Sequence, residues 1–257
     1  MFLFDSHSHL NMPQFTDSLD EVINRAKNIG IKYIINVGFD RKSSKESIKL
    51  SEKYDFIYAV IGFHPHDSKD IKEKDFLWLE KNINHEKVVA IGEIGLDFHY
   101  DNSPREIQKE VFIRQMDIAK KNDFPVVIHS RDAAEQTKKI LFSYNLKTLL
   151  HCYSGSLEMA QKYVKKGYFL ALGGAVTFKN AKKTKQVAAK IPLDNLLIET
   201  DCPYMAPVPY RGKINEPSFI IKVAEEIASI RDISVEKIGL QTFNNACKFF
   251  NLGVLNG

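Results

Sequence analysis

The chain has 257 residues, 44% of them hydrophobic, and no low-complexity tract. This composition excludes an intrinsically disordered protein and is sufficient for a large hydrophobic core. The formal net charge of +4 permits a polyanionic partner without requiring one.

Cysteine usage and the apolar segments bear on the cellular compartment. Cys152, Cys202 and Cys247 form no CxxC pair, so neither a disulfide framework nor a cysteine zinc site is predicted. The first residues do not combine a basic region with a long apolar stretch, so we expect no secretory leader, and no apolar run approaches the roughly 18 residues of a membrane span. We therefore expect a cytoplasmic protein without membrane association or an obligate protein partner.

Eight short apolar or β-branched runs predict β-strands. In chain order they cover residues 2–5, 33–38, 57–62, 88–92, 125–129, 148–151, 168–172 and 195–199. The stretches between them have the spacing of amphipathic helices. In one of these, Ser103, Pro104 and Glu106 are expected to act as N-cap, first-turn proline and capping-box acid. Two further helices are predicted from Ser156 to a stop at Gly167 and from Ser234 to Asn251.

The order of these elements predicts the fold class. Strands that are apolar nearly throughout and alternate with helices are typical of a parallel sheet covered by helices. Eight such units in a chain of this length predict an α/β fold, the TIM (β/α)8 barrel. A doubly wound open sheet is the alternative. No Gly/Ser/Pro-rich linker divides the chain, so we expect a single domain over residues 1–257.

Unusual polar residues gather at the C-terminal ends of the predicted strands. They are His7 and His9 after the first strand, His64 and His66 after the third, Glu93 and Asp97 after the fourth, His129 and Arg131 at the end of the fifth, His151 at the end of the sixth, and Asp201 after the eighth. A lone histidine at a strand end is more often structural. The C-terminal strand ends of a TIM barrel, however, converge on one mouth, where active sites lie. The shared position therefore predicts one site.

The chemistry of this set indicates metal binding. His7 and His9 are two residues apart and would point to the same face of an extended strand. The set offers six candidate ligands, which is more than the three protein ligands usual at a single catalytic zinc ion. Six is the number expected for two metal ions that share one bridging ligand. The bridge should be anionic, and Glu93 is the natural choice. Two metals about 3.5–4 Å apart suit hydrolysis at phosphorus.

Seven segments carry a resemblance to a known family. In chain order they are DSHSHL, GFHPH, GEIGLDF, IHSR, HCYSG, ETDCPY and RGKINEP. Together they resemble the TatD family of metal-dependent deoxyribonucleases, within the amidohydrolase superfamily, from Phe4 to about Phe250. The resemblance implies a TIM barrel, a divalent-metal site and hydrolysis of DNA phosphodiesters, often from a 3′ end. It also implies roles for six residues: His7 and His9 as ligands of one metal, His129 and His151 of the other, Glu93 as the bridge, and Asp201 as the last ligand or base.

A second group is expected to contact substrate: His64, His66, Arg131, Tyr204, Arg211 and Lys213. The three cationic side chains of this group can contact phosphates, and Tyr204, together with Phe98, can stack on a terminal base. The lysine-rich run over residues 179–190 is expected to be a solvated helix face rather than a DNA groove.

These expectations converge on a hydrolase that cleaves DNA with a metal-activated water, with Asp201 holding or accepting its proton and Glu93 as the second catalytic carboxylate. We expect a 3′–5′ exonuclease that acts on single-stranded ends of DNA. Imidazole ligands favour Zn, Mn, Co or Ni over Mg, whereas carboxylates and substrate phosphate can recruit Mg, so the identity of the two metals stays open.

Three alternatives stay open. An amidohydrolase could use the same metal mouth on a small amide or ester, although its expected mark is a carbamate-modified lysine bridge, where this chain has Glu93. A D-aminoacyl-tRNA deacylase would keep a nucleic acid as partner but cleave an ester. A metal-stabilised binding module without catalysis would need neither open coordination positions nor a base.

Overall fold

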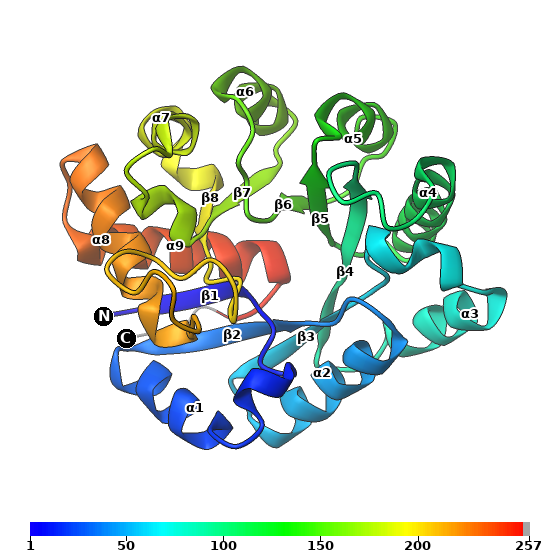
Figure 1. The fold of residues 1–257 in the computed structure, drawn as a ribbon, viewed down its shortest axis with the longest axis horizontal. Helices are drawn as coiled ribbons and strands as arrows, with labels where there is room; N and C mark the ends of the chain where they lie inside the picture. The colour runs from blue at the N-terminus through cyan, green and yellow to red at the C-terminus, as the bar shows by residue number, and fades with distance from the viewer. Residues whose placement is uncertain (254–257) are drawn as a thin grey trace. The chain divides into compact units, whose positions relative to one another are not determined.

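The structure is a computed structural model and describes residues 1–253. Eight strands form one sheet in chain order, β1 to β8 (Figure 1). They are β1 (Leu3–Ser8), β2 (Ile31–Val37), β3 (Ile57–Ile61), β4 (Val88–Asp97), β5 (Val126–Arg131), β6 (Thr148–Leu150), β7 (Phe169–Leu172) and β8 (Leu196–Ile198). A parallel bridge between Ser8 and Cys202 joins the ends of the first and last strands. This sequential order is that of the TIM barrel, which confirms the predicted fold class and excludes the doubly wound alternative.

Nine α-helices lie in the described part of the chain. They are α1 (Leu19–Asn28), α2 (Arg41–Lys53), α3 (Glu73–Asn82), α4 (Arg105–Lys121), α5 (Ala134–Leu141), α6 (Leu157–Lys165), α7 (Lys182–Lys190), α8 (Ile220–Arg231) and α9 (Val235–Phe250). No helix within residues 1–253 is both long and apolar enough to cross a membrane.

The chain comprises two compact units. Unit 1 consists of Met1–Ile35 and the chain from His151 onward, and unit 2 is Asn36–Leu150. The expectation of a single domain over residues 1–257 stays a prediction, and its last four positions lie outside the described residues.

The core of unit 1 is built by α9 against β1 and β8 (Figure 1). The Phe4 ring of β1 stacks on Phe250 of α9, with ring centroids 5.8 Å apart. Gly239 of α9 allows a close approach, since a Cβ there would lie 2.9 Å from the Phe2 carbonyl oxygen. This packing fixes the start of the chain, and with it the strand that carries His7.

The core of unit 2 depends on the pairing of β4 with β5. The two strands are parallel, with Gly95 opposite His129 and Asp97 opposite Arg131. Gly95 has a φ of +145°, and a Cβ at this position would lie 1.9 Å from the His129 carbonyl oxygen. Only glycine fits this backbone and this contact.

The strand bounds correct two predictions. Glu93 and Asp97 lie within β4 rather than after it, and His7 lies within β1. The predicted strand stopped at Gly92, but Gly95 is required by the close approach of β5 and the strand continues through it to Asp97.

The helix ends correct one predicted cap and confirm two others. Ser103 does not cap α4, because its hydroxyl donates to the His66 carbonyl at 2.7 Å and accepts the Lys69 N–H at 3.1 Å. Ser156 does cap α6, and Ser234 caps α9, which ends at Asn251 in the left-handed region.

We expect Ser156→Ala to lower the free energy of unfolding by about 1 kcal/mol, because the Met159 N–H loses its acceptor. Urea unfolding of the full chain measures this difference. The control is Ser154→Ala, an exposed residue of the same loop, for which the change should stay within about 0.5 kcal/mol. Equal losses in the two variants would contradict the capping role.

Candidate metal centre

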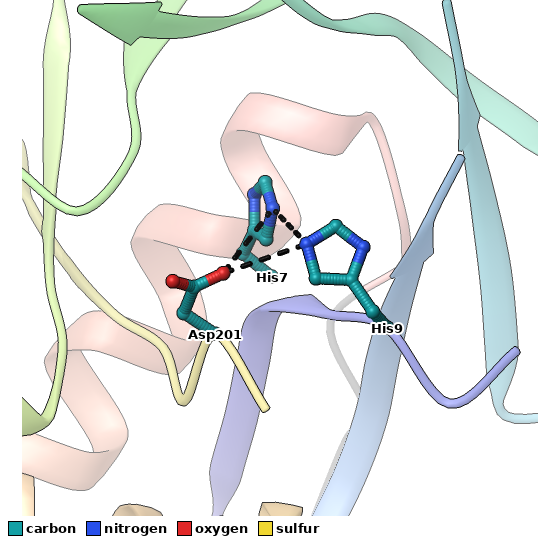
Figure 2. A group of neighbouring side chains, drawn as sticks. All are labelled: His7, His9 and Asp201. Carbon is teal, nitrogen blue, oxygen red and sulfur yellow. Dashed lines mark hydrogen bonds and ion pairs between the residues drawn. The ribbon is translucent and has the colours of Figure 1, made fainter. Parts of the chain in front are cut away.

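Three donor groups of unit 1 converge where β1 ends and the chain leaves β8 (Figure 2). The Nε2 atoms of His7 and His9 are 3.3 Å apart. Asp201 Oδ1 lies 3.9 Å from His7 Nε2 and 3.5 Å from His9 Nε2. Two imidazole nitrogens and a carboxylate oxygen directed at one point suit a divalent transition metal. The three residues therefore could hold one metal ion together, and their predicted role as its ligands stays a prediction.

Backbone hydrogen bonds fix the position of Asp201. Its N–H donates to the His7 carbonyl at 2.9 Å, and the His9 N–H donates to the Cys202 carbonyl at 2.8 Å. Asp201 has a φ of +56°, a conformation that aspartate tolerates better than most residues. The Asn215 side chain donates to the carbonyls of Thr200 and Tyr204, both at 2.7 Å. The carboxylate is thus held from both sides by buried backbone contacts.

His151 and Glu199 extend the unit 1 cluster. The His151 ring stacks on His7, with centroids 4.0 Å apart and an interplanar angle of 16°. Its Nδ1 lies 3.6 Å from Glu199 Oε1, which also accepts the Cys152 N–H at 2.5 Å. Sequence reasoning missed Glu199, although it stands two residues before Asp201 in the segment ETDCPY.

Asp5 belongs to the same unit but has a structural role. Burial raises its pKa to about 8, and hydrogen bonds with Thr200 offset only part of this effect. The Thr200 N–H and the Asp5 Oδ1 are 2.9 Å apart, and the Thr200 hydroxyl lies 2.6 Å from Oδ2. Asp5 therefore ties β1 to the segment that carries Asp201.

A second cluster lies in unit 2, with Glu93 on β4, His129 on β5 and His64 just after β3. Glu93 Oε1 lies 2.8 Å from His129 Nδ1 and 3.5 Å from His64 Nε2. The Glu93 and His64 side chains are largely buried, and that of His129 is 17% exposed. These three groups also offer donor atoms close enough to share one cation. The sequence predicted Glu93 and His129 as ligands and placed His64 in the substrate site.

Burial lowers the pKa of His64 to about 4, despite the opposing effect of Glu93. The imidazole is therefore neutral at pH 7. Its Nδ1 accepts the His66 N–H at 3.2 Å, so the proton of the neutral ring resides on Nε2.

Asp97 is the residue of unit 2 that the predicted site omitted. Its carboxylate is buried, with Oδ2 3.0 Å from His66 Nε2 and 3.1 Å from His129 Nε2. Burial alone would raise its pKa, but hydrogen bonds from His129, Tyr100 and His66 outweigh burial and hold the pKa far below the usual range. Asp97 is thus a carboxylate shared by two histidines.

Four further residues were predicted to contact substrate: Arg131, Arg211, Lys213 and Tyr204. In unit 2 the Arg131 guanidinium lies 4.7 Å from the Tyr100 ring centroid. In unit 1 the Arg211 guanidinium lies 3.8 Å from the Phe178 ring, and Lys213 Nζ lies 5.8 Å from the Tyr210 ring. Tyr204 is 48% exposed, and its ring centroid is 6.3 Å from that of His9. Tyr204 is therefore the predicted substrate residue that the structure places beside a metal-ligand candidate of unit 1.

Comparison with known proteins agrees with the donor chemistry. The model of the TatD related DNase family matches residues 4–251. An uncharacterized metal-dependent hydrolase of Bacillus subtilis, YabD, is 48% identical over 253 residues, which are 97% of this chain and 99% of that protein. The crystal structure of YjjV, a TatD homolog from Escherichia coli, superposes with a TM-score of 0.93 at 32% identity and 98% coverage of each chain.

A more distant structure shares the fold alone: an organophosphorus hydrolase from Deinococcus radiodurans, with 12% identity and a TM-score of 0.68. The family match covers nearly the whole chain and includes every residue of both donor clusters. This chain therefore belongs to the TatD family of metal-dependent hydrolases.

Proposed function

We propose that this protein hydrolyses phosphodiester bonds of DNA, as a 3′–5′ exonuclease that acts on single-stranded ends with two divalent metal ions. The observation that carries the proposal is the convergence of His7, His9 and Asp201 in the unit that also bears the exposed Tyr204. The description of the matched family as a DNase supports the choice of substrate.

Each donor cluster would hold one metal, Mg, Mn or Zn. His7, His9 and Asp201 would hold one ion in unit 1, and Glu93 with His129 would hold one in unit 2. That Glu93 bridges the two ions, and that His151 joins His129, stays a prediction. When bound, the ions supply a water of lowered pKa and positive charge opposite the phosphate.

The chain's own side chains would orient the reaction. Asp201 presents its carboxylate at a fixed point. Burial raises its pKa, but without a metal the hydrogen bond with His9 and the charge of the neighbouring histidines outweigh burial, and a bound metal would supply that positive charge in their place. One of the Asp201 oxygens would accept the proton of the attacking water, as a general base. Glu93 contributes the anionic charge that two neighbouring cations require.

The predicted substrate contacts would hold the polyanion. Arg211 and Lys213, in the loop after Asp201, are exposed cations that can contact successive phosphates. Tyr204 offers a half-exposed ring on which a terminal base can stack. His64 and His66 in unit 2 offer imidazole nitrogens, and Arg131 an exposed guanidinium, to the same substrate.

We expect Mn or Zn to raise the unfolding temperature of the metal-free protein, since a ligand of the native state stabilises it by about 2.7 kcal/mol at 100 times its Kd. His9→Gln should remove much of this shift, because Asp201 and His7 lose a partner. The control is His85→Gln, which alters a surface histidine paired with Glu52. Differential scanning calorimetry with and without chelator measures the shift. An equal shift in all three proteins would contradict the unit 1 site.

We expect Asp201→Asn to lower the rate of cleavage of end-labelled single-stranded DNA by about 10²–10⁴-fold, the usual contribution of a general base. Asp232→Asn is the matched control, because Asp232 is exposed and has a similar φ of +53°. The same panel includes a D-aminoacyl-tRNA and a small neutral ester. If the protein hydrolyses the D-aminoacyl-tRNA or the neutral ester but does not cleave DNA, the hydrolysed compound replaces DNA as the substrate.

We expect the double variant Arg211→Glu, Lys213→Glu to raise the Michaelis constant for DNA and to flatten its dependence on salt, because two phosphate contacts are lost. The control is Lys182→Glu, Lys183→Glu, an equal change of charge on exposed positions of α7. Turnover of a neutral ester should be unaffected in both. If the salt dependence of the Michaelis constant flattens only in the α7 variant, the DNA contact lies on α7 and not on the loop after Asp201.

A further inference from the structure

Asp97 has a full set of hydrogen bonds but no place in the proposed reaction. It ends β4, and its side chain is 1% exposed. Oδ1 accepts the N–H groups of His99 and Tyr100, both at 2.9 Å. Oδ2 faces the Nε2 atoms of His66 and His129 at 3.0 and 3.1 Å. Four donors thus surround one carboxylate.

We propose that Asp97 is a positioning residue that keeps the proton of His129 on Nε2, so that Nδ1 presents its lone pair to the metal held with Glu93. The inference rests on the proposed metal site of unit 2. Asp97 would touch neither metal nor substrate and would act only through the histidine.

The His129 ring lies between two carboxylates, with Asp97 on its Nε2 side and Glu93 on its Nδ1 side. An ionised carboxylate can only accept a hydrogen bond, so Nε2, which is 3.1 Å from Asp97 Oδ2, faces an acceptor, and so does Nδ1, which is 2.8 Å from Glu93 Oε1. A metal held with Glu93 would take the place of the proton on Nδ1, and the contact with Asp97 would leave the single proton of the neutral ring on Nε2. Such carboxylate–histidine–metal chains fix ring orientation and tautomer.

The position of Asp97 is set in advance by Gln108. The buried Gln108 amide accepts the Asp97 N–H at 2.9 Å and donates to the Asp97 carbonyl at 3.0 Å. Gln108 also donates to the Ser103 carbonyl at 2.8 Å. The backbone of Asp97 is therefore fixed at both its N–H and its carbonyl, and the N–H groups of His99 and Tyr100 hold the carboxylate that faces His129.

His64 provides an internal contrast. It lies near the same Glu93 oxygen, but its Nδ1 accepts a backbone N–H, so its proton is on the nitrogen that faces Glu93. In His64 the ring nitrogen remote from Glu93 accepts a backbone N–H, whereas in His129 the ring nitrogen remote from Glu93 faces a carboxylate. Asp97 is the difference between the two environments.

The test compares the wild type with Asp97→Asn and with Asp132→Asn. An asparagine at 97 can keep an oxygen on the two backbone N–H groups and then turns its N–H2 toward the imidazoles, which forces the proton of His129 onto Nδ1. Asp132 is the matched control, since its exposed carboxylate pairs with His99 at 2.9 Å in the same unit. Zinc titration against a chromophoric chelator should show one site weakened about 10–100-fold in Asp97→Asn and unchanged in Asp132→Asn.

The tautomer itself is measured on the zinc-loaded wild type, so the proposal does not depend on the folding of a variant. Two-bond 1H–15N correlations of the histidine rings, with His129 identified by its loss in His129→Gln, should show His129 protonated on Nε2. Zinc bound with Nδ1 protonated, or an Asp97→Asn affinity within twofold of wild type, would overturn the role of Asp97 while leaving the metal site intact. Absence of zinc from unit 2 would instead overturn the metal site.

Discussion

Both clusters are governed by the free-energy cost of burying ionisable side chains away from water. A buried charge costs several kcal/mol unless it is paired, neutralised or bound to a cation. The protein reduces this cost in different ways. The pKa of Asp5 is raised, whereas the carboxylate of Asp97 is paired with two histidines. His7, His9 and Asp201 place three donor atoms around one point instead. A cation at that point would complete the charge balance of the cluster.

The donor positions are fixed by backbone hydrogen bonds within or to the strands. Asp201 is held by reciprocal backbone bonds with the strand that carries His7. In unit 2, Gly95 lets β5 approach closely enough to set His129 opposite β4. Groups placed on hydrogen-bonded strands need little reorganisation when a ligand binds, which favours metal affinity and catalysis alike.

The sequence predicted the strands and helices well where local pattern decides them, whereas the roles of the site residues stay predictions. All eight strands and the caps at Ser156 and Ser234 follow from local patterns. The extent of β4 could not be predicted, because the role of Gly95 depends on a strand distant in the chain. Ser103 resembled a cap but bonds to His66 and Lys69. Asp97 was noticed but not given a role, since its two histidine partners are 31 and 32 positions away.

The most direct test of this account is anomalous diffraction from crystals of the protein grown with zinc or manganese. The account predicts one anomalous peak in contact with His7, His9 and Asp201, and one in contact with Glu93 Oε1 and His129 Nδ1. Peaks confined to surface carboxylates, or a metal bound to His129 through Nε2 in place of Asp97, would contradict it.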